Sequence, residues 1–267
     1  MSAQRRVPCV AVAPVLAILW AIGSAAAPLP AQRGNDAHPA EIRTELSTAA
    51  SGHAMGATVA GSRTYVLERN TTVDDSVTRW NPCQPVQWQI NLHGAPAGAL
   101  RTATEAVRRV AKATGLTFVY VGTTSVIPQS SWGADDSPPL TIAWARPGHG
   151  PGHSDLLPGG STVGMGGTRS TGAVLPGSVG WNMRIATAYV VLDIDASRYF
   201  PPTFATQPSL GALLMHELGH AVGLGHATER DEIMYPSTVS GRPSRWGAGD
   251  RAGLRLVGAS AGCIPTS

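Results

Sequence analysis

One eleven-residue stretch constrains the fold and the chemistry of this chain more than any other feature. It reads His-Glu-Leu-Gly-His-Ala-Val-Gly-Leu-Gly-His and runs from His216 to His226. Because His216 and His220 are four residues apart, a helix places them one turn apart on the same face. Gly223 can end that helix and turn the chain, which brings His226 back toward the other two imidazoles. The spacing predicts a zinc ion held by three histidines, with the fourth coordination position open for water or substrate.

Glu217 follows the first of these histidines. On a helix its carboxylate projects beside the metal instead of binding it, which suits a general base that acts on a water at the metal. The alternative interpretation is a helix whose histidines share no ligand. Three imidazoles, one carboxylate and one glycine at these fixed positions favour a hydrolytic metal site, with Glu217 as its catalytic residue.

A second short segment follows the histidines. It reads Glu232-Ile-Met234-Tyr-Pro236 and places a methionine in a tight turn after the third histidine, as is typical of metzincins. Together the two segments resemble the metzincin family of zinc endopeptidases, and the Ile-Met-Tyr-Pro form is similar to its matrixin branch. The resemblance covers residues 80–258 and is strongest over 209–258. It implies an α+β catalytic domain of the zincin type, in which a twisted mixed β-sheet and three helices form a zinc cleft.

The resemblance also implies roles around this cleft. Met234 would pack beneath the zinc without binding it, and Asp250, in a C-terminal helix, would brace the turn that carries Met234. The family normally has two adjacent aspartates in that helix, and the first of them pairs with the N-terminus that is freed on activation. In this chain Gly249 occupies the position of that first aspartate. Four residues would form one wall of the pocket for the residue after the cleaved bond: Tyr235, Pro236, Ser237 and Thr238.

The N-terminal residues have the pattern of a secretory signal peptide. Arg5 and Arg6 precede an apolar run that ends in small residues suited to cleavage. We therefore expect a signal peptide over residues 1–27, a linker or short pro-segment over 28–63, and a secreted metallopeptidase domain over 64–267. An uncleaved leader that anchors the protein in a membrane is the alternative.

The charge of the chain indicates no nucleic-acid partner. The formal net charge is +3 at pH 7, and removal of residues 1–27, with two arginines and no acid, lowers it to +1. Lys112 is the only lysine among twenty basic residues, a ratio that indicates a GC-rich genome and a bacterial origin. We expect a monomer that acts on a protein or peptide and has no stable membrane association once the leader is removed. A non-catalytic binding module with the same fold and a hydrolase of non-peptide bonds are the competing hypotheses.

Two cysteines predict a disulfide. Cys9 lies in the leader, so Cys83 and Cys263 form an even pair in an exported protein. Their disulfide would tie the start of the domain to its C-terminus. The alternative is a cysteine switch of the matrixin kind, in which Cys83 caps the zinc, although little chain separates Cys83 from the next expected strand.

Hydrophobic periodicity predicts the order strand, helix, strands, helix, helix. Alternating and β-branched runs indicate strands, while apolar residues at helical spacing indicate helices. The expected strands are 86–92, 117–121, 140–144 and 184–193, and the expected helices are 97–113 and 209–222, to which the resemblance adds a C-terminal helix at 246–256.

A glycine-rich segment, residues 146–182, is predicted to be a long loop. Its residues 161–164 fall where the edge strand of the family lines the cleft and pairs with an extended substrate. The family binds a structural zinc and calcium in this region, and the candidate ligands here are His149, His153 and Asp155, with ordinary surface histidines as the alternative. One carboxylate is too few for a calcium cage. We expect one catalytic zinc and leave a structural calcium or a second zinc open.

Overall fold

The computed structural model describes residues 56–58, 64–70, 76–132, 140–173 and 182–265. The predicted signal peptide lies outside these ranges, as does most of the predicted linker. Within these ranges, none of the helices has the length and apolar character needed to cross a membrane.

One mixed sheet is the largest element of the domain. Its strand order is β6-β5-β7-β10-β9, so β9 and β6 are its edges, and β8 pairs with the end of β7. The neighbours from β6 to β10 run parallel, and β9 runs antiparallel to β10. The bounds are β5 Val86–Ile90, β6 Phe118–Thr123, β7 Leu140–Pro147, β8 His153–Ser154, β9 Gly164–Ala173 and β10 Asn182–Asp193.

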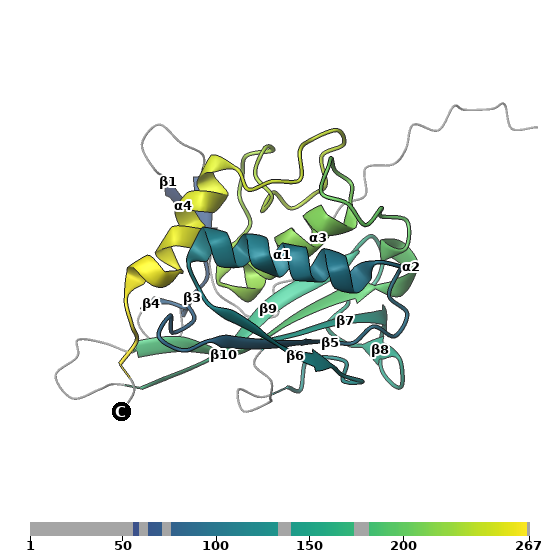
Figure 1. Ribbon diagram of the computed structural model, residues 1–267, viewed down its shortest axis with the longest axis horizontal. Helices are drawn as coiled ribbons and strands as arrows, with labels where there is room; N and C mark the ends of the chain where they lie inside the picture. Colours follow the sequence, from purple (N-terminus) through teal and green to yellow (C-terminus); the bar gives the residue numbers. More distant parts are fainter. Residues whose placement is uncertain (1–55, 59–63, 71–75, 133–139, 174–181, 266–267) are drawn as a thin grey trace, which may run out of the picture. The chain divides into compact units, whose positions relative to one another are not determined.

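Three longer helices lie on one side of this sheet (Figure 1). They are α1, α3 and α4, in agreement with the three helices expected from the resemblance, and a single turn, α2, follows β10. The α+β fold with a mixed sheet is therefore confirmed. The bounds are α1 Ala99–Thr114, α2 Ile194–Ser197, α3 Leu210–Ala221 and α4 Ala248–Leu256, followed by a 3-10 turn, η1, at Ala259–Ala261.

Helix α1 shows how the sequence sets these boundaries. Its small and apolar residues recur at helical spacing, and the buried ones, including Ala103 and Val110, face the core beneath α3. The helix ends where the sequence predicts, because Gly115 adopts a left-handed conformation with φ +73° and its N–H donates to the carbonyl of Ala111 at 2.8 Å.

Two small sheets accompany the main sheet, one with three strands and one with two. β2 (Thr64–Leu67) pairs with β1 (Gly56–Thr58) and with β11 (Leu224–Gly225), and β3 (Arg69–Asn70) pairs with β4 (Ser76–Val77). β1 falls within the predicted linker, so part of that segment pairs with the domain. β11 directly precedes His226, which makes β2 a support for the segment that carries the third histidine.

The prediction of one long loop over the glycine-rich segment 146–182 is wrong, because this segment contains β9. Glycine has low strand propensity, which is why the sequence pattern gave no strand signal. Pairing with β10 along the whole of β9 overrides that weak propensity. The glycines also fit the packing, since a Cβ at Gly164 would lie 2.7 Å from the Leu192 side chain. The edge strand expected at 161–164 therefore begins only at Gly164.

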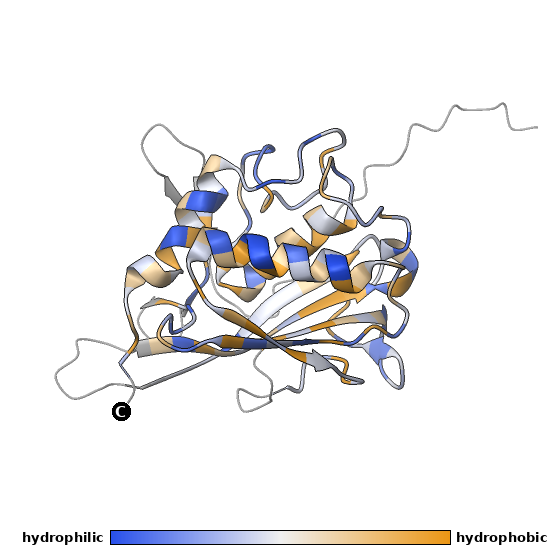
Figure 2. Ribbon diagram, viewed as in Figure 1, coloured by the Kyte–Doolittle hydropathy of each residue, from blue (hydrophilic) through white to orange (hydrophobic). Residues whose placement is uncertain are grey.

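The main sheet buries apolar side chains on both faces. Because side chains alternate along a strand, Val190 and Leu192 point to the cluster beneath the helices while Tyr189 and Val191 point to the opposite face. Figure 2 shows hydrophobic residues along the strands and hydrophilic residues on the outer turns of α1 and α4. The smaller cluster on the opposite face comprises Ala145, Leu156, Leu157, Met165, Tyr189 and Val191.

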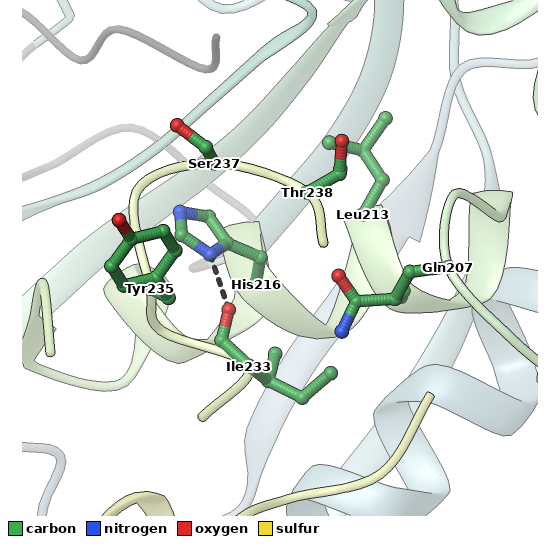
Figure 3. A pocket seen from close by; sticks show the side chains of 8 residues that line it. Gln207, Leu213, His216, Ile233, Tyr235, Ser237 and Thr238 are labelled. Atoms are coloured by element: carbon green, nitrogen blue, oxygen red, sulfur yellow. Dashed lines mark hydrogen bonds between the residues drawn. The ribbon is translucent and has the colours of Figure 1, made fainter. Parts of the chain in front are cut away.

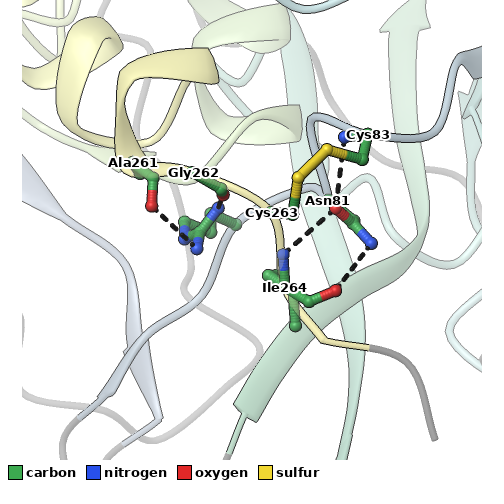
Figure 4. Close-up of a disulfide and its surroundings, with 7 residues drawn as sticks. Asn81, Cys83, Ala261, Gly262, Cys263 and Ile264 are labelled. Atoms are coloured by element: carbon green, nitrogen blue, oxygen red, sulfur yellow. Dashed lines mark hydrogen bonds between the residues drawn. A yellow bond between two sulfur atoms is a disulfide. The ribbon is translucent and has the colours of Figure 1, made fainter.

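The predicted disulfide is present. Cys83 and Cys263 are bonded across 180 residues with their Cα atoms 5.4 Å apart (Figure 4). Asn81 strengthens the same junction, because its side chain donates to the Ile264 carbonyl at 2.9 Å and accepts from the Ile264 N–H at 3.1 Å. Since Cys83 is bonded to Cys263, the alternative of a cysteine switch at Cys83 is wrong.

Candidate metal centre

Helix α3 supplies two of the three histidines. It begins at Ser209, whose Oγ accepts a hydrogen bond from the Ala212 N–H at 3.2 Å, as expected for an N-cap. All twelve residues of α3 are buried, because the helix packs between α1 and β9. The polar atoms of His216 and Glu217 are thus withdrawn from bulk water and need specific partners.

A glycine makes the turn that recovers the third histidine. Gly223 has φ +103°, and a Cβ at this position would lie 2.6 Å from the Thr78 carbonyl oxygen. Both the backbone conformation and the close contact therefore require glycine. The chain then enters β11, pairs with β2 and presents His226 toward the other two imidazoles.

Two carbonyl groups fix the orientation of the α3 imidazoles. The Nδ1 atom of His216 lies 2.7 Å from the Ile233 oxygen, and that of His220 lies 2.7 Å from the Leu224 oxygen. A carbonyl only accepts, so each Nδ1 carries the proton and each Nε2 keeps a free lone pair. The two Nε2 atoms are 3.2 Å apart, and the ligand atoms of all three histidines lie within 4.8 Å of one another.

This arrangement fits a zinc ion. Two nitrogen acceptors at 3.2 Å repel each other unless a cation lies between them, and nitrogens about 2.0–2.1 Å from one tetrahedral ion are about 3.3 Å apart. The Nε2 atom of His226 is buried and has no hydrogen-bond partner within the described residues. His216, His220 and His226 therefore converge as a donor set that could hold a zinc ion.

The imidazoles are neutral at pH 7. Burial lowers the pKa of His216 to about 4 and that of His226 to about 3, where the neighbouring His216 ring adds to the effect. Burial, followed by the two other rings, moves the pKa of His220 well below its usual value. Neutral imidazole is the form that binds a metal, so no proton has to be removed first.

Glu217 lies between α3 and the edge strand β9. Its side chain is fully buried, and neither carboxylate oxygen has a hydrogen-bond partner within the described residues. A Cβ at Gly164 would lie 2.8 Å from Oε1, which shows how closely the strand approaches the carboxylate. Burial raises the pKa of Glu217 to about 8, and the nearby backbone N–H of Gly166 offsets part of this rise. A divalent cation at the imidazoles would also lower the pKa of Glu217.

The turn that carries Met234 lies beneath α3. Met234 is 1% exposed, and its sulfur occupies the space that a Cβ at Gly219 would need. Asp250 accepts hydrogen bonds from the Ile233 N–H at 2.6 Å and the Met234 N–H at 3.2 Å. Asp250 thus braces this turn as the resemblance implied, and the same turn supplies the carbonyl that orients His216.

Glu232 is a buried acid whose role no sequence pattern indicated. Its Oε1 accepts from the Gly249 N–H at 2.9 Å and its Oε2 from the Asp250 N–H at 2.8 Å, so it caps the N-terminus of α4. A Cβ at Gly247 would overlap its carboxylate, so the helix start fits around it. The turn and the helix therefore each provide a carboxylate to the other.

A small pocket, partly open to solvent, lies next to His216 (Figure 3). Of the four residues predicted to form a wall of a substrate pocket, Tyr235, Ser237 and Thr238 line this one and Pro236 does not. Helix α3, the segment before it and Ile233 in the Met234 turn supply the rest of the wall. The remaining lining residues are Gln207, Ala212, Leu213 and Ile233, of which Gln207 lies outside every motif of the sequence.

The candidate ligands of a second metal do not converge. The His149 Nδ1 atom is 4.0 Å from a carboxylate oxygen of Asp155, and the His149 side chain is 85% exposed. His153 Nδ1 contacts the Pro151 carbonyl at 2.9 Å, and Asp155 accepts from the backbone and side chain of Ser130. Over the ranges that the structure describes, the three histidines of the motif are the one group of at least three metal-binding side chains that converges.

Comparison with known protein families gives one match. The family described as Matrixin matches residues 101–255, which are 155 of the 267 residues. The match spans most of α1, the α3 histidines, His226 and most of α4. No curated protein matches the chain.

Proposed function

This chain belongs to the matrixin family, and from that premise we propose that it is a secreted zinc endopeptidase. The observation that carries the proposal is the convergence of three imidazoles, two of which keep a free Nε2 lone pair because their Nδ1 protons are bound to carbonyl groups. A binding module that kept only the fold would have no need for a buried carboxylate beside these rings.

The donor set would hold one catalytic zinc through His216, His220 and His226. When bound, the ion would lower the pKa of a coordinated water and polarise the carbonyl group of the peptide bond. The two carbonyl-bound Nδ1 protons keep the α3 rings in one tautomer and one orientation.

Glu217 would move the proton of the reaction. Its carboxylate takes a proton from the attacking water while the new C–O bond forms, and returns it to the amide nitrogen as the C–N bond breaks. Its burial supports this role, because a carboxylate without hydrogen-bond partners within the described residues is a strong proton acceptor.

The edge strand and the pocket would position the substrate. β9 is an edge of the main sheet, so an extended peptide can add to it as a further antiparallel strand. The pocket beside His216 would then receive the side chain that follows the cleaved bond. Export is supported by the N-terminal leader pattern and by the disulfide, which is typical of oxidising compartments.

The test compares the wild type with Glu217→Ala. We expect the wild type to contain about one zinc ion per chain and to cleave casein or a peptide library. Glu217→Ala is expected to keep the zinc and to lose activity by roughly 10²–10⁴-fold. His149→Ala, which removes an exposed histidine, is the control and should keep both.

A wild-type protein that binds zinc and cleaves no peptide would favour the non-catalytic binding module. Export is tested separately by sequencing the N-terminus of the protein released by a secreting host. A released form that begins after residue 27 supports a cleaved leader, and a form retained in the membrane with Met1 supports the anchor.

A further inference from the structure

Gln207 brings a polar group to a pocket whose helical wall is apolar. Ala212 and Leu213 form that wall, while Ser237 and Thr238 contribute hydroxyl groups from the opposite segment. Figure 3 shows the carboxamide of Gln207 extending from the side toward His216, with its oxygen on the side of Thr238 and its nitrogen on the side of Ile233.

Backbone hydrogen bonds hold Gln207 in place. Its N–H donates to the Arg242 carbonyl at 2.7 Å, and its carbonyl accepts from the Gly241 N–H at 3.0 Å. The segment before α3 is thereby tied to the segment that follows the Met234 turn. A side chain on such a doubly bonded backbone has a defined direction.

A third hydrogen bond fixes which way the carboxamide faces. The Val239 N–H donates to Oε1 of Gln207 at 3.1 Å. A backbone N–H only donates, so the oxygen must face it and the amide nitrogen must face the other way. Within the described residues this nitrogen donates to no protein acceptor, and Gln207 is only half-buried, so its two N–H groups are available to a ligand.

The pocket carries no charged side chain to attract an ion. Apart from the neutral His216, its lining consists of apolar, hydroxyl and amide groups. A charged substrate side chain would lose hydration there without a countercharge. A neutral side chain with a terminal oxygen would accept a hydrogen bond from the Gln207 amide, and an amide would in addition donate to the Thr238 hydroxyl oxygen.

We propose that Gln207 is a specificity-determining residue and selects peptides with asparagine or glutamine directly after the cleaved bond. This inference rests on the proposed endopeptidase function and on the pocket that receives that side chain. A site that offers a fixed donor discriminates against an apolar side chain, which leaves the donor unpaired.

The experiment measures kcat/KM for peptides that differ only in the residue after the cleaved bond. We expect the wild type to cleave the asparagine and glutamine peptides about tenfold faster than the leucine and methionine peptides, one net hydrogen bond being worth about this factor. Gln207→Leu should reverse this order. Gln207→Glu keeps the acceptor for Val239 and adds a negative charge, and should shift the preference to lysine. Gln87→Leu, at an exposed position on β5, should retain the wild-type order.

The outcomes separate this inference from the proposed function. A wild type that prefers leucine, or a Gln207→Leu variant with unchanged preference and unchanged zinc content, refutes the role of Gln207 and leaves the endopeptidase intact. Failure of the wild type to cleave any peptide overturns the endopeptidase proposal and, with it, the selectivity that rests on it.

Discussion

Replacing Glu232 with glutamine tests whether the turn beneath the zinc site depends on a buried carboxylate. Glu232 is 2% exposed and accepts one backbone N–H on each oxygen, from Gly249 and Asp250. Asp250 in return accepts from Ile233, whose carbonyl orients the His216 ring. A change at Glu232 should therefore reach the metal ligand through three hydrogen bonds, by way of Asp250 and Ile233.

The magnitude follows from the hydrogen bonds. Glutamine replaces one acceptor oxygen with an NH₂ group that faces a backbone N–H, which removes one hydrogen bond and leaves a buried donor unsatisfied. This costs about 2–3 kcal/mol. In a domain of about 200 residues each kcal/mol lowers Tm by about 2–4 °C, so we expect a decrease of about 4–12 °C.

The substitution also removes the electrostatic repulsion between Glu232 and Asp250, which raises the stability of the fold by a smaller amount. Burial raises the pKa of Asp250 to about 7, and the nearby Glu232 carboxylate adds to the rise. Removing the Glu232 charge therefore stabilises ionised Asp250. The gain is limited, because Asp250 already accepts N–H groups from Gly247, Ile233 and Met234. The lost hydrogen bond should outweigh it.

Two measurements decide the question. Thermal unfolding of Glu232→Gln should show the lower Tm, and competition with a chromophoric chelator should show zinc binding weakened by about 10-fold or more, as for other groups that orient metal ligands. Asp193→Asn is the matched control, since Asp193 caps α2 by accepting from the backbone of Asp195 and Ala196. It should leave zinc affinity unchanged. If Glu232→Gln unfolds at the wild-type temperature and binds zinc as tightly, the reasoning is wrong.

Three further predictions concern packing, pH and the disulfide. Gly166→Ala should destabilise the fold by about 1–3 kcal/mol in urea unfolding, because its Cβ would overlap the backbone carbonyl of Glu217. Burial raises the pKa of Glu68 from 4.5 to about 7, so the folded state holds one more proton than the unfolded state between these pH values. The wild type should therefore lose stability as the pH rises from 4.5 to 7. Glu68→Gln should be about 1–3 kcal/mol more stable than the wild type at pH 8 and about equally stable at pH 4.5. Cys83→Ser should lower the unfolding free energy by about 4–5 kcal/mol, the chain-entropy value for a cross-link across 180 residues, which calorimetry can measure.

The sequence was most informative where local geometry alone sets the structure. The spacing of His216 and His220 placed them on one helical face, and Gly223 marked the turn toward His226 because few other residues adopt its backbone conformation. The boundary of α1 at Gly115 was predictable for the same reason. These features depend on residues that are close in the chain.

Contacts between distant segments were beyond the sequence pattern. Glu232 and the N-terminus of α4 are brought together only by the tertiary fold, and an isolated acid before a hydrophobic pair carries no periodic signal. Gln207 enters the pocket because the segment before α3 bonds to residues 239–242, a pairing that no propensity or spacing rule anticipates. Both residues lie outside the histidine motif 216–226, on whose surroundings they act.

The missed strand β9 shows why a composition typical of loops can be a requirement of the site. Gly164 and Gly166 have no Cβ, so the strand approaches the Glu217 side chain and backbone more closely than any other residue would allow. That contact buries the carboxylate and places it against the sheet edge along which an extended peptide would lie. Larger residues would raise the strand propensity of this segment and at the same time push the edge strand away from α3. The low strand propensity of β9 is thus a consequence of the close packing that the active-site helix needs.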